Sequence, residues 1–363
     1  MSYSELLLFK RYPELVENIP WLSLGSFPTA VQKLTILEQN LEYDGIWIKR
    51  DDQTGELYGG NKVRKLEFII ADVLRRKKQW ILTFGGLGSN HCLATALYGR
   101  EHGLKTVLCL IDQPLTEHTQ EQLLRFDYLG AKISYARNTT GAVLKGVWQL
   151  ASKWGVYLLG PGGSSEFGNL GYVEAGLELA NQIDNGLLPK PGHVYVPIGT
   201  MGTYCGLKIG FELADLDIDL VGVRVTERSM TNEKKAAKLV NKTAKMLQSF
   251  SDDIPEIELA PADIHIDHDF AGPSYGAVTD EGLEAQQLLS ETEGIHLETT
   301  YTGKAFAGML DHIRSKKLSG EPVLYWHTYN SVDLRDMVRK HHDFTHLPRA
   351  FHKFFKENLI SYI

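Results

Sequence analysis

The chain has 363 residues, 43% of them hydrophobic, so it is long enough for two domains of ordinary size or one large one. Its formal net charge is -7 and it has no long basic run, which argues against nucleic acid as a partner. Cys92, Cys109 and Cys205 lie far apart, and none belongs to a CxxC motif. This spacing predicts no metal cluster and no disulfide framework, and it favours a reducing, cytoplasmic location.

We expect no signal peptide at the N-terminus and no membrane-spanning segment. Residues 1–12 lack the charged and apolar regions of a signal peptide. No apolar run reaches the length that spans a membrane, so we expect no membrane association. Residues 344–363 are rich in aromatic side chains, and we expect them to pack on the body of the protein or on another subunit.

The first half of the chain begins with an arm and continues as alternating strands and helices. Residues 46–50 alternate and include the β-branched Ile46 and Ile48, which predicts a strand, and apolar residues recur at helical spacing from 62 to about 78. The further predicted strands are 80–84, 106–111, 131–134 and 156–159. The predicted helices that follow them end near 102 or span 119–129, 143–154 and 170–183.

The same alternation resumes after a break at residues 189–192. The predicted strands are 193–197, 219–225 and 323–327, and the predicted helices are 204–213, 232–250, 279–292 and 304–315. This order predicts an α/β protein with doubly wound, open, parallel sheets. Ligands of such sheets bind at the carboxyl ends of strands. Four motifs lie at such ends, namely Ser89-Asn90, the Gly160 loop, the Gly199 loop and His327-Thr328.

The most informative motif is residues 59–67, GGNKVRKLE. Its two glycines permit a sharp turn, and Asn61 is a favourable N-cap for the helix that follows. Lys62 then lies in the first helical turn, where the positive end of the helix dipole lowers its pKa. A partly neutral lysine can attack a carbonyl and form a Schiff base. The alternative is a solvated lysine at the start of a helix.

A second motif offers a binding site for a phosphate group. Gly199-Thr200-Met201-Gly202-Thr203 combines backbone N–H donors, two hydroxyls and the start of a helix. The alternative, a tight turn in which Thr200 or Thr203 caps the helix, is about as well supported. The motif is neither a Walker loop nor a good dinucleotide fingerprint, because it lacks the following Gly-Lys and the third glycine.

Polar residues at two further helix starts complete the candidate site. Ser89 suits a carboxylate and Asn90 suits a phenolic oxygen, although a Ser/Asn helix cap is the better-supported interpretation when the motif is taken alone. Thr302 either caps its helix or forms a hydrogen bond with a neutral ring nitrogen, and Tyr301 beside it would stand near the reacting carbon. Tyr275, in a Gly/Pro loop, is either a second pocket hydroxyl or a surface residue.

With these motifs, the chain resembles the pyridoxal-phosphate enzymes of the 1-aminocyclopropane-1-carboxylate (ACC) deaminase/D-cysteine desulfhydrase family, in the tryptophan-synthase-β-like fold group (PLP fold type II). The resemblance runs from about Ile46 to about Thr328 and is most specific at GGNKVRKLE. It implies that pyridoxal 5'-phosphate is the cofactor and that Lys62 is the Schiff-base lysine. It also implies that Lys65 lies near the cofactor phosphate.

The resemblance assigns the remaining site residues as well. GGLGSNH implies that Ser89 meets the substrate carboxylate and Asn90 a cofactor oxygen, and GTMGT implies that residues 199–203 bind the phosphate. SYG and YTGKAFAGML imply that Tyr275 and Tyr301 line the reacting side. No metal is implied.

The resemblance further implies a homodimer and two domains with the cofactor between them. We place the large cofactor-binding domain at residues 1–63 and 176–363. The small α/β domain, residues 64–175, is inserted into it.

Thr302 bears on the reaction. By the resemblance, the residue at this position in ACC deaminases is a glutamate. A carboxylate keeps the pyridine nitrogen protonated and makes the ring a strong electron sink, whereas a threonine leaves the nitrogen largely neutral. β-Elimination needs less carbanion stabilisation than the opening of a cyclopropane ring. The sequence therefore favours a lyase that releases pyruvate, ammonia and sulfide from D-cysteine or a similar small amino acid.

Three other functions stay open. ACC deamination is the first alternative, and Thr302 argues against it. The second alternative is a protein that binds pyridoxal phosphate or an amino acid without turnover. It is motivated by Met201 and by Tyr329-Asn330, which replaces the Gly-Gly that the resemblance implies. A nucleotide-binding dehydrogenase is a distant third, because no acidic ribose-binding residue follows a proper glycine fingerprint.

Overall fold

The computed structural model describes residues 3–318, 320–340 and 343–356 and divides the chain into two compact units. Unit 1 comprises Met1–Phe68 and Ser164–Val332, and unit 2 comprises Ile69–Gly163 and Asp333–Ile363. The proposed inserted domain of residues 64–175 stays a prediction. Of the aromatic tail, residues 357–363 lie outside the described residues.

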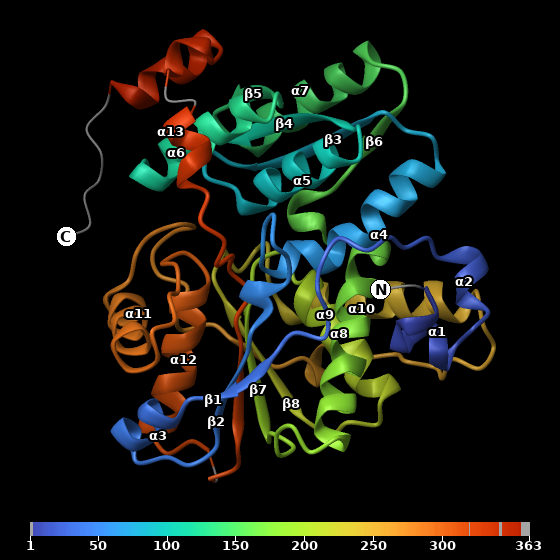
Figure 1. Cartoon of the computed structure of the whole chain (residues 1–363), viewed down its shortest axis with the longest axis vertical. Helices are drawn as coiled ribbons and strands as arrows, with labels where there is room; N and C mark the ends of the chain where they lie inside the picture. Colours follow the sequence, from blue (N-terminus) through green and yellow to red (C-terminus); the bar gives the residue numbers. More distant parts are fainter. Residues whose placement is uncertain (1–2, 319, 341–342, 357–363) are drawn as a thin grey trace. The chain divides into compact units, whose positions relative to one another are not determined.

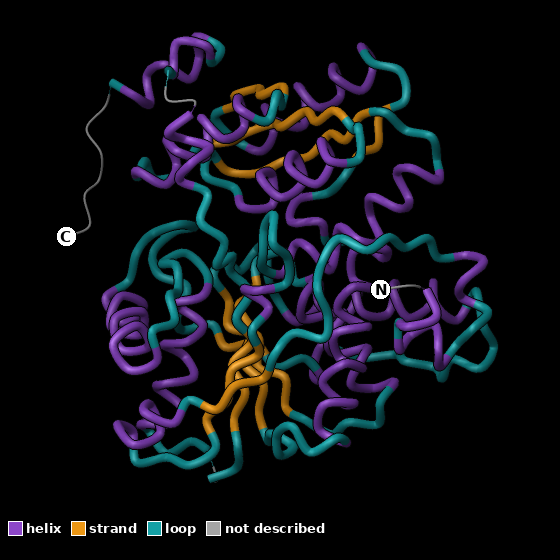
Figure 2. The backbone as a smooth tube through the Cα atoms, in the orientation of Figure 1, coloured by secondary structure: helices purple, strands orange, loops and turns teal. Residues whose placement is uncertain are grey.

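Unit 1 is built on a six-stranded sheet (Figures 1 and 2). In spatial order its strands are β1 (Val31–Lys33), β2 (Ile46–Lys49), β10 (Val323–Trp326), β7 (His193–Ile198), β8 (Asp219–Arg224) and β9 (Ile266–Asp267). The edge strand β1 is antiparallel to β2, and the other neighbours are parallel. The carboxyl ends of β2, β10, β7 and β8 therefore lie at one edge of the sheet.

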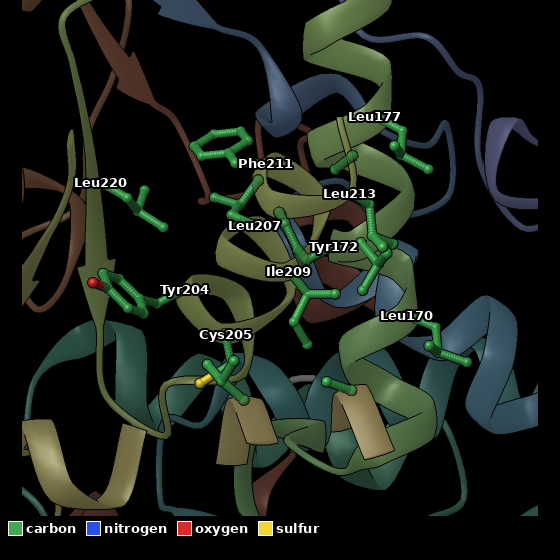
Figure 3. Close-up of a cluster of buried hydrophobic side chains, with 14 of the residues drawn as sticks. Leu170, Tyr172, Leu177, Tyr204, Cys205, Leu207, Ile209, Phe211, Leu213 and Leu220 are labelled. Atoms are coloured by element: carbon green, nitrogen blue, oxygen red, sulfur yellow. The ribbon is translucent and has the colours of Figure 1, made fainter. Parts of the chain in front are cut away.

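Both faces of this sheet are buried. Side chains alternate along each strand, so successive residues pack into apolar clusters on opposite faces. In β7, Val194 and Val196 pack into one apolar cluster, whereas Tyr195 packs into another. Figure 1 shows α8 (Glu166–Asp184), α9 (Gly202–Leu213) and α10 (Glu233–Gln248) on one side, and α3 (Thr35–Leu41), α11 (Asp280–Glu293) and α12 (Thr302–Arg314) on the other. Figure 3 shows leucine and aromatic side chains of α8 and α9 filling the first cluster.

Unit 2 contains a four-stranded, fully parallel sheet. Its strands, in spatial order, are β5 (Lys132–Ala136), β4 (Lys105–Ile111), β3 (Trp80–Gly86) and β6 (Val156–Leu158). Its helices are α5 (Asn90–Glu101), α6 (Glu117–Tyr128), α7 (Thr139–Ser152) and α13 (Arg335–Lys340). Figure 1 shows α5 and α7 on opposite sides of this sheet. Helix α4 (Asn61–Arg75) contains the boundary between the two units, after Phe68.

The predicted doubly wound α/β fold is confirmed, and each predicted strand and helix is present with bounds shifted by a few residues. The sequence did not reveal the edge strands β1 and β9 or the helices α1 (Leu7–Arg11), α2 (Leu15–Asn18), α3 and α13. These elements are too short to show a hydrophobic period. In the described part of the chain, no helix is long and apolar enough to cross a membrane, and no group of three or more His, Cys, Asp or Glu side chains could hold a metal ion.

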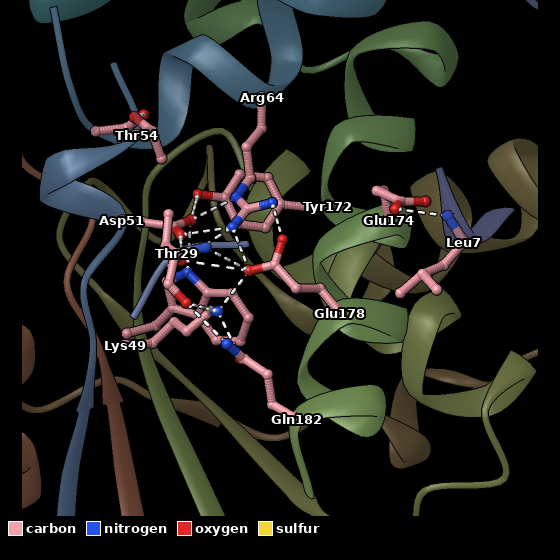
Figure 4. A network of polar contacts seen from close by, with 12 residues as sticks. Leu7, Thr29, Lys49, Asp51, Thr54, Arg64, Tyr172, Glu174, Glu178 and Gln182 are labelled. Carbon is pink, nitrogen blue, oxygen red and sulfur yellow. Dashed lines mark hydrogen bonds and ion pairs between the residues drawn. The ribbon is translucent and has the colours of Figure 1, made fainter. Parts of the chain in front are cut away.

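A buried network of charges joins α4 to the sheet and to α8 in unit 1 (Figure 4). Arg64, 2% exposed, donates through Nε and Nη2 to both carboxylate oxygens of Asp51, at 2.9 and 2.8 Å. It also donates to both oxygens of Glu178, at 3.0 and 2.9 Å. Tyr172 and Trp326 donate to Asp51 as well. Burial raises the pKa of Asp51, but the Arg64 guanidinium and the Lys49 ammonium outweigh burial and bring that pKa to about 2.

We expect Arg64→Met to lower the free energy of unfolding by about 3–5 kcal/mol, because it leaves two buried carboxylates without their shared cation. Urea denaturation monitored by circular dichroism at neutral pH measures this change. The matched control is Arg314→Met, whose partner Glu284 is exposed, so solvent screening leaves little to lose. Equal stabilities of the Arg64 and Arg314 variants would contradict the role of the network.

Candidate functional site

The turn that carries Lys62 is packed against the chain that follows β10. Gly60 has a φ of +83°, and a Cβ there would lie 2.7 Å from the carbonyl oxygen of Thr328. The backbone N–H of Asn61 donates to this same carbonyl, at 3.0 Å. Only glycine combines this backbone angle with so close an approach, so the sequence Gly-Gly-Asn places Lys62 beside the carboxyl end of β10.

The predicted capping role of Asn61 is wrong, because α4 begins at Asn61 itself. The side-chain Nδ2 of Asn61 instead donates to Oγ1 of Thr203, at 3.1 Å. This contact ties the first residue of α4 to the first turn of α9. The sequence could not reveal the partner, because the two residues are 142 positions apart.

Asn330 lies at a position where, by the resemblance, the family has a glycine. Its side chain forms hydrogen bonds that hold the same turn. Its Oδ1 accepts the backbone N–H groups of Gly59, at 2.6 Å, and Val332, at 3.0 Å. Its Nδ2 donates to the carbonyl of Val332, at 2.8 Å. The Asn330 side chain therefore restrains the backbone of Gly59 by a hydrogen bond, and we call this contact a clamp.

The loop between β7 and α9 turns sharply at Met201. Met201 adopts a left-handed conformation with φ of +64° and is the N-cap residue of α9, without a side-chain cap. The alternative in which Thr200 or Thr203 caps the helix is therefore wrong. The Met201 side chain is buried in the apolar cluster of α8 and α9, away from bulk solvent. The buried Met201 side chain thus holds the loop in place at the residue where the backbone turns.

A chain of polar contacts joins this loop to Lys65. The Nζ of Lys65 donates to Oγ of Ser164 at 3.3 Å, and Ser164 is 2.7 Å from the hydroxyl of Thr200. The backbone N–H of Gly202 donates to the same Ser164 oxygen, at 3.1 Å, and a Cβ on Gly202 would come within 2.4 Å of it. Sequence analysis missed Ser164, although it lies in a Gly/Ser-rich loop after a strand, where ligand contacts are expected.

Lys65 is 2% exposed and sits in an environment that opposes its charge. Burial lowers its pKa well below the usual value, the nearby Lys62 ammonium lowers it further, and Cys205 acts in the opposite direction. A phosphate group bound here would favour the charged lysine. Hydroxyls, backbone N–H groups and an ammonium are the donors that a phosphate requires, so the residues present fit the phosphate of pyridoxal phosphate.

Two tyrosines lie next to this loop. The hydroxyls of Tyr275 and Tyr301 are 2.5 Å apart, and their rings meet edge to face with centroids 6.0 Å apart. A Cβ on Gly199 would lie 3.5 Å from the ring of Tyr301, in ordinary van der Waals contact. The structure therefore brings both predicted tyrosines together with the first residue of the predicted phosphate loop.

The loop that carries Tyr275 is held by a buried lysine that sequence analysis missed. Lys304 is fully buried in α12, and its Nζ donates to the carbonyl of Ala271, at 2.7 Å. Burial lowers the pKa of Lys304, and Glu298 opposes this effect. A charged residue inside the apolar segment KAFAGML was a usable signal, because buried lysines need a specific partner.

Thr302 is fully buried and is the first residue of α12, so the reading in which it caps this helix is wrong. Its hydroxyl accepts the backbone N–H of Glu298 at 2.8 Å and lies 3.2 Å from a carboxylate oxygen of the same residue. That carboxylate accepts the backbone N–H groups of Thr300, Tyr301 and Thr302. Burial raises the pKa of Glu298, and these donors oppose the shift. Glu298 thus supplies the capping function that was assigned to Thr302.

Ser89 and Asn90 belong to unit 2, at the start of α5. Ser89 is the N-cap of this helix, and its hydroxyl accepts the N–H of Cys92, at 3.2 Å. Asn90 Oδ1 accepts a hydrogen bond from Nε2 of Gln122, at 3.1 Å. His91 is buried with its Nε2 2.8 Å from the hydroxyl of Thr83, as expected of a polar side chain that fills the core.

Unit 1 alone therefore gathers the residues at the start of α4, the predicted phosphate loop, both tyrosines and Thr302 around the carboxyl ends of its strands. The catalytic and cofactor-binding roles stay predictions for every proposed site residue, namely Lys62, Lys65, Ser89, Asn90, residues 199–203, Tyr275, Tyr301 and Thr302.

Comparison with known proteins gives the family. Residues 22–328 match the family model described as pyridoxal-phosphate dependent enzyme. The D-cysteine desulfhydrases of Salmonella newport (strain SL254) and Salmonella paratyphi A are 36% identical over 321 and 323 residues, which cover 86% of this chain and 94% of theirs.

Solved structures agree with this assignment. The crystal structure of an ACC deaminase homologue is 30% identical, with a TM-score of 0.76 over 88% of this chain and 94% of that one. Threonine deaminase isoform 2 from Solanum lycopersicum, 16% identical with a TM-score of 0.58, shares the fold over 92% of this chain and 86% of its own. The chain belongs to the family of pyridoxal-phosphate dependent enzymes and has their type II fold.

Proposed function

We propose that this protein is a pyridoxal-phosphate-dependent lyase that eliminates sulfide from D-cysteine. The relatives named D-cysteine desulfhydrase, which match 86% of the chain, support this substrate. The choice of reaction rests on one observation. Thr302 is a neutral residue at a position where, by the family resemblance, ACC deaminases have a glutamate. Its hydroxyl accepts the backbone N–H of Glu298 and lies 3.2 Å from a carboxylate oxygen of Glu298, and we propose that this hydroxyl, rather than a carboxylate, faces the ring nitrogen.

The proposed roles follow from the chemistry of each side chain. When bound, pyridoxal phosphate supplies an aldehyde for an amino group and a conjugated ring that accepts electrons from the α-carbon. Lys62 would hold the cofactor through its Nζ, and the same Nζ, as a neutral amine, would be the general base that takes the α-proton. Ser89 and the first amides of α5 bind the substrate carboxylate.

Other residues hold the cofactor and the reacting side. Lys65, Thr200 and the N–H groups of residues 199–203 bind the phosphate. Asn90 donates to the phenolic oxygen. The hydroxyls of Tyr275 and Tyr301 are 2.5 Å apart, close enough to exchange a proton with each other, and one of them would protonate the departing sulfur.

The reaction balances with water as the second reactant. The α-proton leaves to Lys62 while the bond between the β-carbon and sulfur breaks, and the sulfur departs with its electron pair and a proton as hydrogen sulfide. The released enamine then takes up water to give pyruvate and ammonia.

We further propose a cytoplasmic homodimer. The family resemblance supports the dimer. The three cysteines are all free and buried, which supports a reducing compartment.

We expect the purified protein to release sulfide and pyruvate from D-cysteine and to form much less 2-oxobutyrate from ACC. Parallel assays of sulfide and of 2-oxoacids measure this preference. Faster turnover of ACC would favour the deaminase alternative, for which the ACC deaminase homologue is the structural support. A visible cofactor band without product from any D- or L-amino acid would favour binding without turnover.

Lys62→Ala should lose the visible absorbance band of the bound cofactor, together with all turnover, because no other amine would take its place. Absorbance spectra after incubation with pyridoxal phosphate measure the loss. A band that survives in the variant would assign the Schiff base to another lysine.

Lys65→Met should weaken the binding of pyridoxal phosphate by about tenfold at neutral pH, because it removes a charge-assisted contact to the phosphate. Since an anion raises the lowered pKa of Lys65, binding takes up a proton, and the wild-type affinity should fall as the pH rises above that lowered pKa. Titrations with pyridoxal phosphate and with inorganic phosphate at several pH values measure both effects.

The control for this experiment is Lys208→Met, on the helix that begins at the same loop and paired there with Glu212. The ionisation of the ligand itself affects all three proteins equally. Equal affinity and equal pH dependence of the wild type and Lys65→Met would contradict the assignment of the phosphate site.

A further inference from the structure

In unit 2, three side chains of α6 form a relay of hydrogen bonds that ends on Asn90. Arg125 donates through Nη1 to Oε1 of Gln122, at 3.2 Å, and Gln122 donates through Nε2 to Oδ1 of Asn90, at 3.1 Å. The other arm of Arg125, Nη2, donates to Glu121 at 2.7 Å. Gln122 is 1% and Arg125 6% exposed, so water has little access to compete with these bonds.

The relay has a fixed direction, because a guanidinium carries only donors. Arg125 must face the oxygen of the Gln122 amide, and this leaves the nitrogen of that amide facing Asn90. The nitrogen can only donate, so Asn90 presents its oxygen to Gln122. The remaining half of the Asn90 carboxamide is then a pair of N–H donors, although an isolated asparagine could turn either way.

This arrangement is costly for a purely structural contact. Burying a guanidinium is unfavourable unless all its donors are satisfied. Within the part of the chain that the structure describes, Nε of Arg125 is buried without a hydrogen-bond partner. An apolar side chain at this position would fill the space without leaving a donor unsatisfied, so the cost indicates a role beyond packing.

We propose that Gln122 and Arg125 are positioning residues that fix the Asn90 carboxamide with its N–H groups toward the phenolic oxygen of bound pyridoxal phosphate. This inference rests on the proposed function, in which Asn90 meets that oxygen. A donor held in this orientation stabilises the deprotonated oxygen, whereas the amide oxygen would repel it. Two residues on α6 that touch neither substrate nor cofactor thereby influence the protonation of the cofactor.

The test is Gln122→Glu, which keeps the shape of the side chain and pairs it with Arg125. A carboxylate only accepts, so Asn90 must turn its N–H groups inward and direct its oxygen at the cofactor. We expect the affinity for pyridoxal phosphate to fall about tenfold. The pH at which the visible band of the holoenzyme titrates should rise by about one unit, because the deprotonated oxygen loses its donor.

Two further variants make the test specific. Gln149→Glu introduces the same change on α7, where the side chain already accepts from Lys153, and should leave affinity and titration as in the wild type. Arg125→Met removes the source of the direction without adding a charge, and should shift the titration in the same sense by a smaller amount. Circular dichroism confirms that each variant is folded. If Gln122→Glu does not fold, Arg125→Met decides.

Asn90→Ala separates this proposal from the proposed function. If Asn90→Ala shifts the titration while Gln122→Glu and Arg125→Met match the wild type, Asn90 meets the cofactor and the relay is overturned. If Asn90→Ala has no effect, or the wild type binds no pyridoxal phosphate, the proposed contact of Asn90 fails and the relay fails with it. A shift in all three variants, with none in Gln149→Glu, supports the relay.

Discussion

The geometry of the site in unit 1 depends on the buried guanidinium of Arg64. It holds the loop after β2, through Asp51, and helix α8, through Glu178, to the first turn of α4. In a helix, side chains two positions apart point about 200° apart, and those three positions apart lie on one side. With Arg64 directed into the network, Lys62 points to the opposite side of α4, and Lys65, one position after Arg64, points about 100° away from it, toward Ser164. The ion pairs of Arg64 thus also fix the directions in which the side chains of Lys62 and Lys65 leave the helix.

Much of the fold could be predicted from the sequence because it depends on local regularities. Apolar runs separated by glycine-rich turns recur in strand and helix lengths, and parallel strands bring their carboxyl ends to one edge whatever their order. Tyr301 and the Gly199 loop could thus be expected near each other, and they are in contact. Edge strands such as β9, with two residues, carry too few side chains to show an alternation.

The polar partners within the site could not be predicted, because they are distant in sequence. Asn61 is a residue type that often caps helices, but its side chain donates to Thr203. The backbone N–H of Thr302 donates to the carboxylate of Glu298, four positions upstream. Local propensity describes what a side chain does in the absence of tertiary contacts, and buried hydrogen bonds outweigh it here. The burial of Lys65 belongs to the same class, because its spacing from Lys62 shows a shared side of the helix but not the depth of each amine.

The clamp formed by Asn330 bears on how the protein folds around Lys62. Two consecutive glycines give the unfolded chain its greatest conformational freedom, so ordering Gly59 and Gly60 costs more entropy than ordering any other pair of residues. Contacts from the segment after β10, including the two N–H groups accepted by Asn330, offset that cost. Because β10 is synthesised more than 250 residues after the glycines by their numbering, the turn that carries Lys62 can be completed only after β10 and Asn330 have been synthesised.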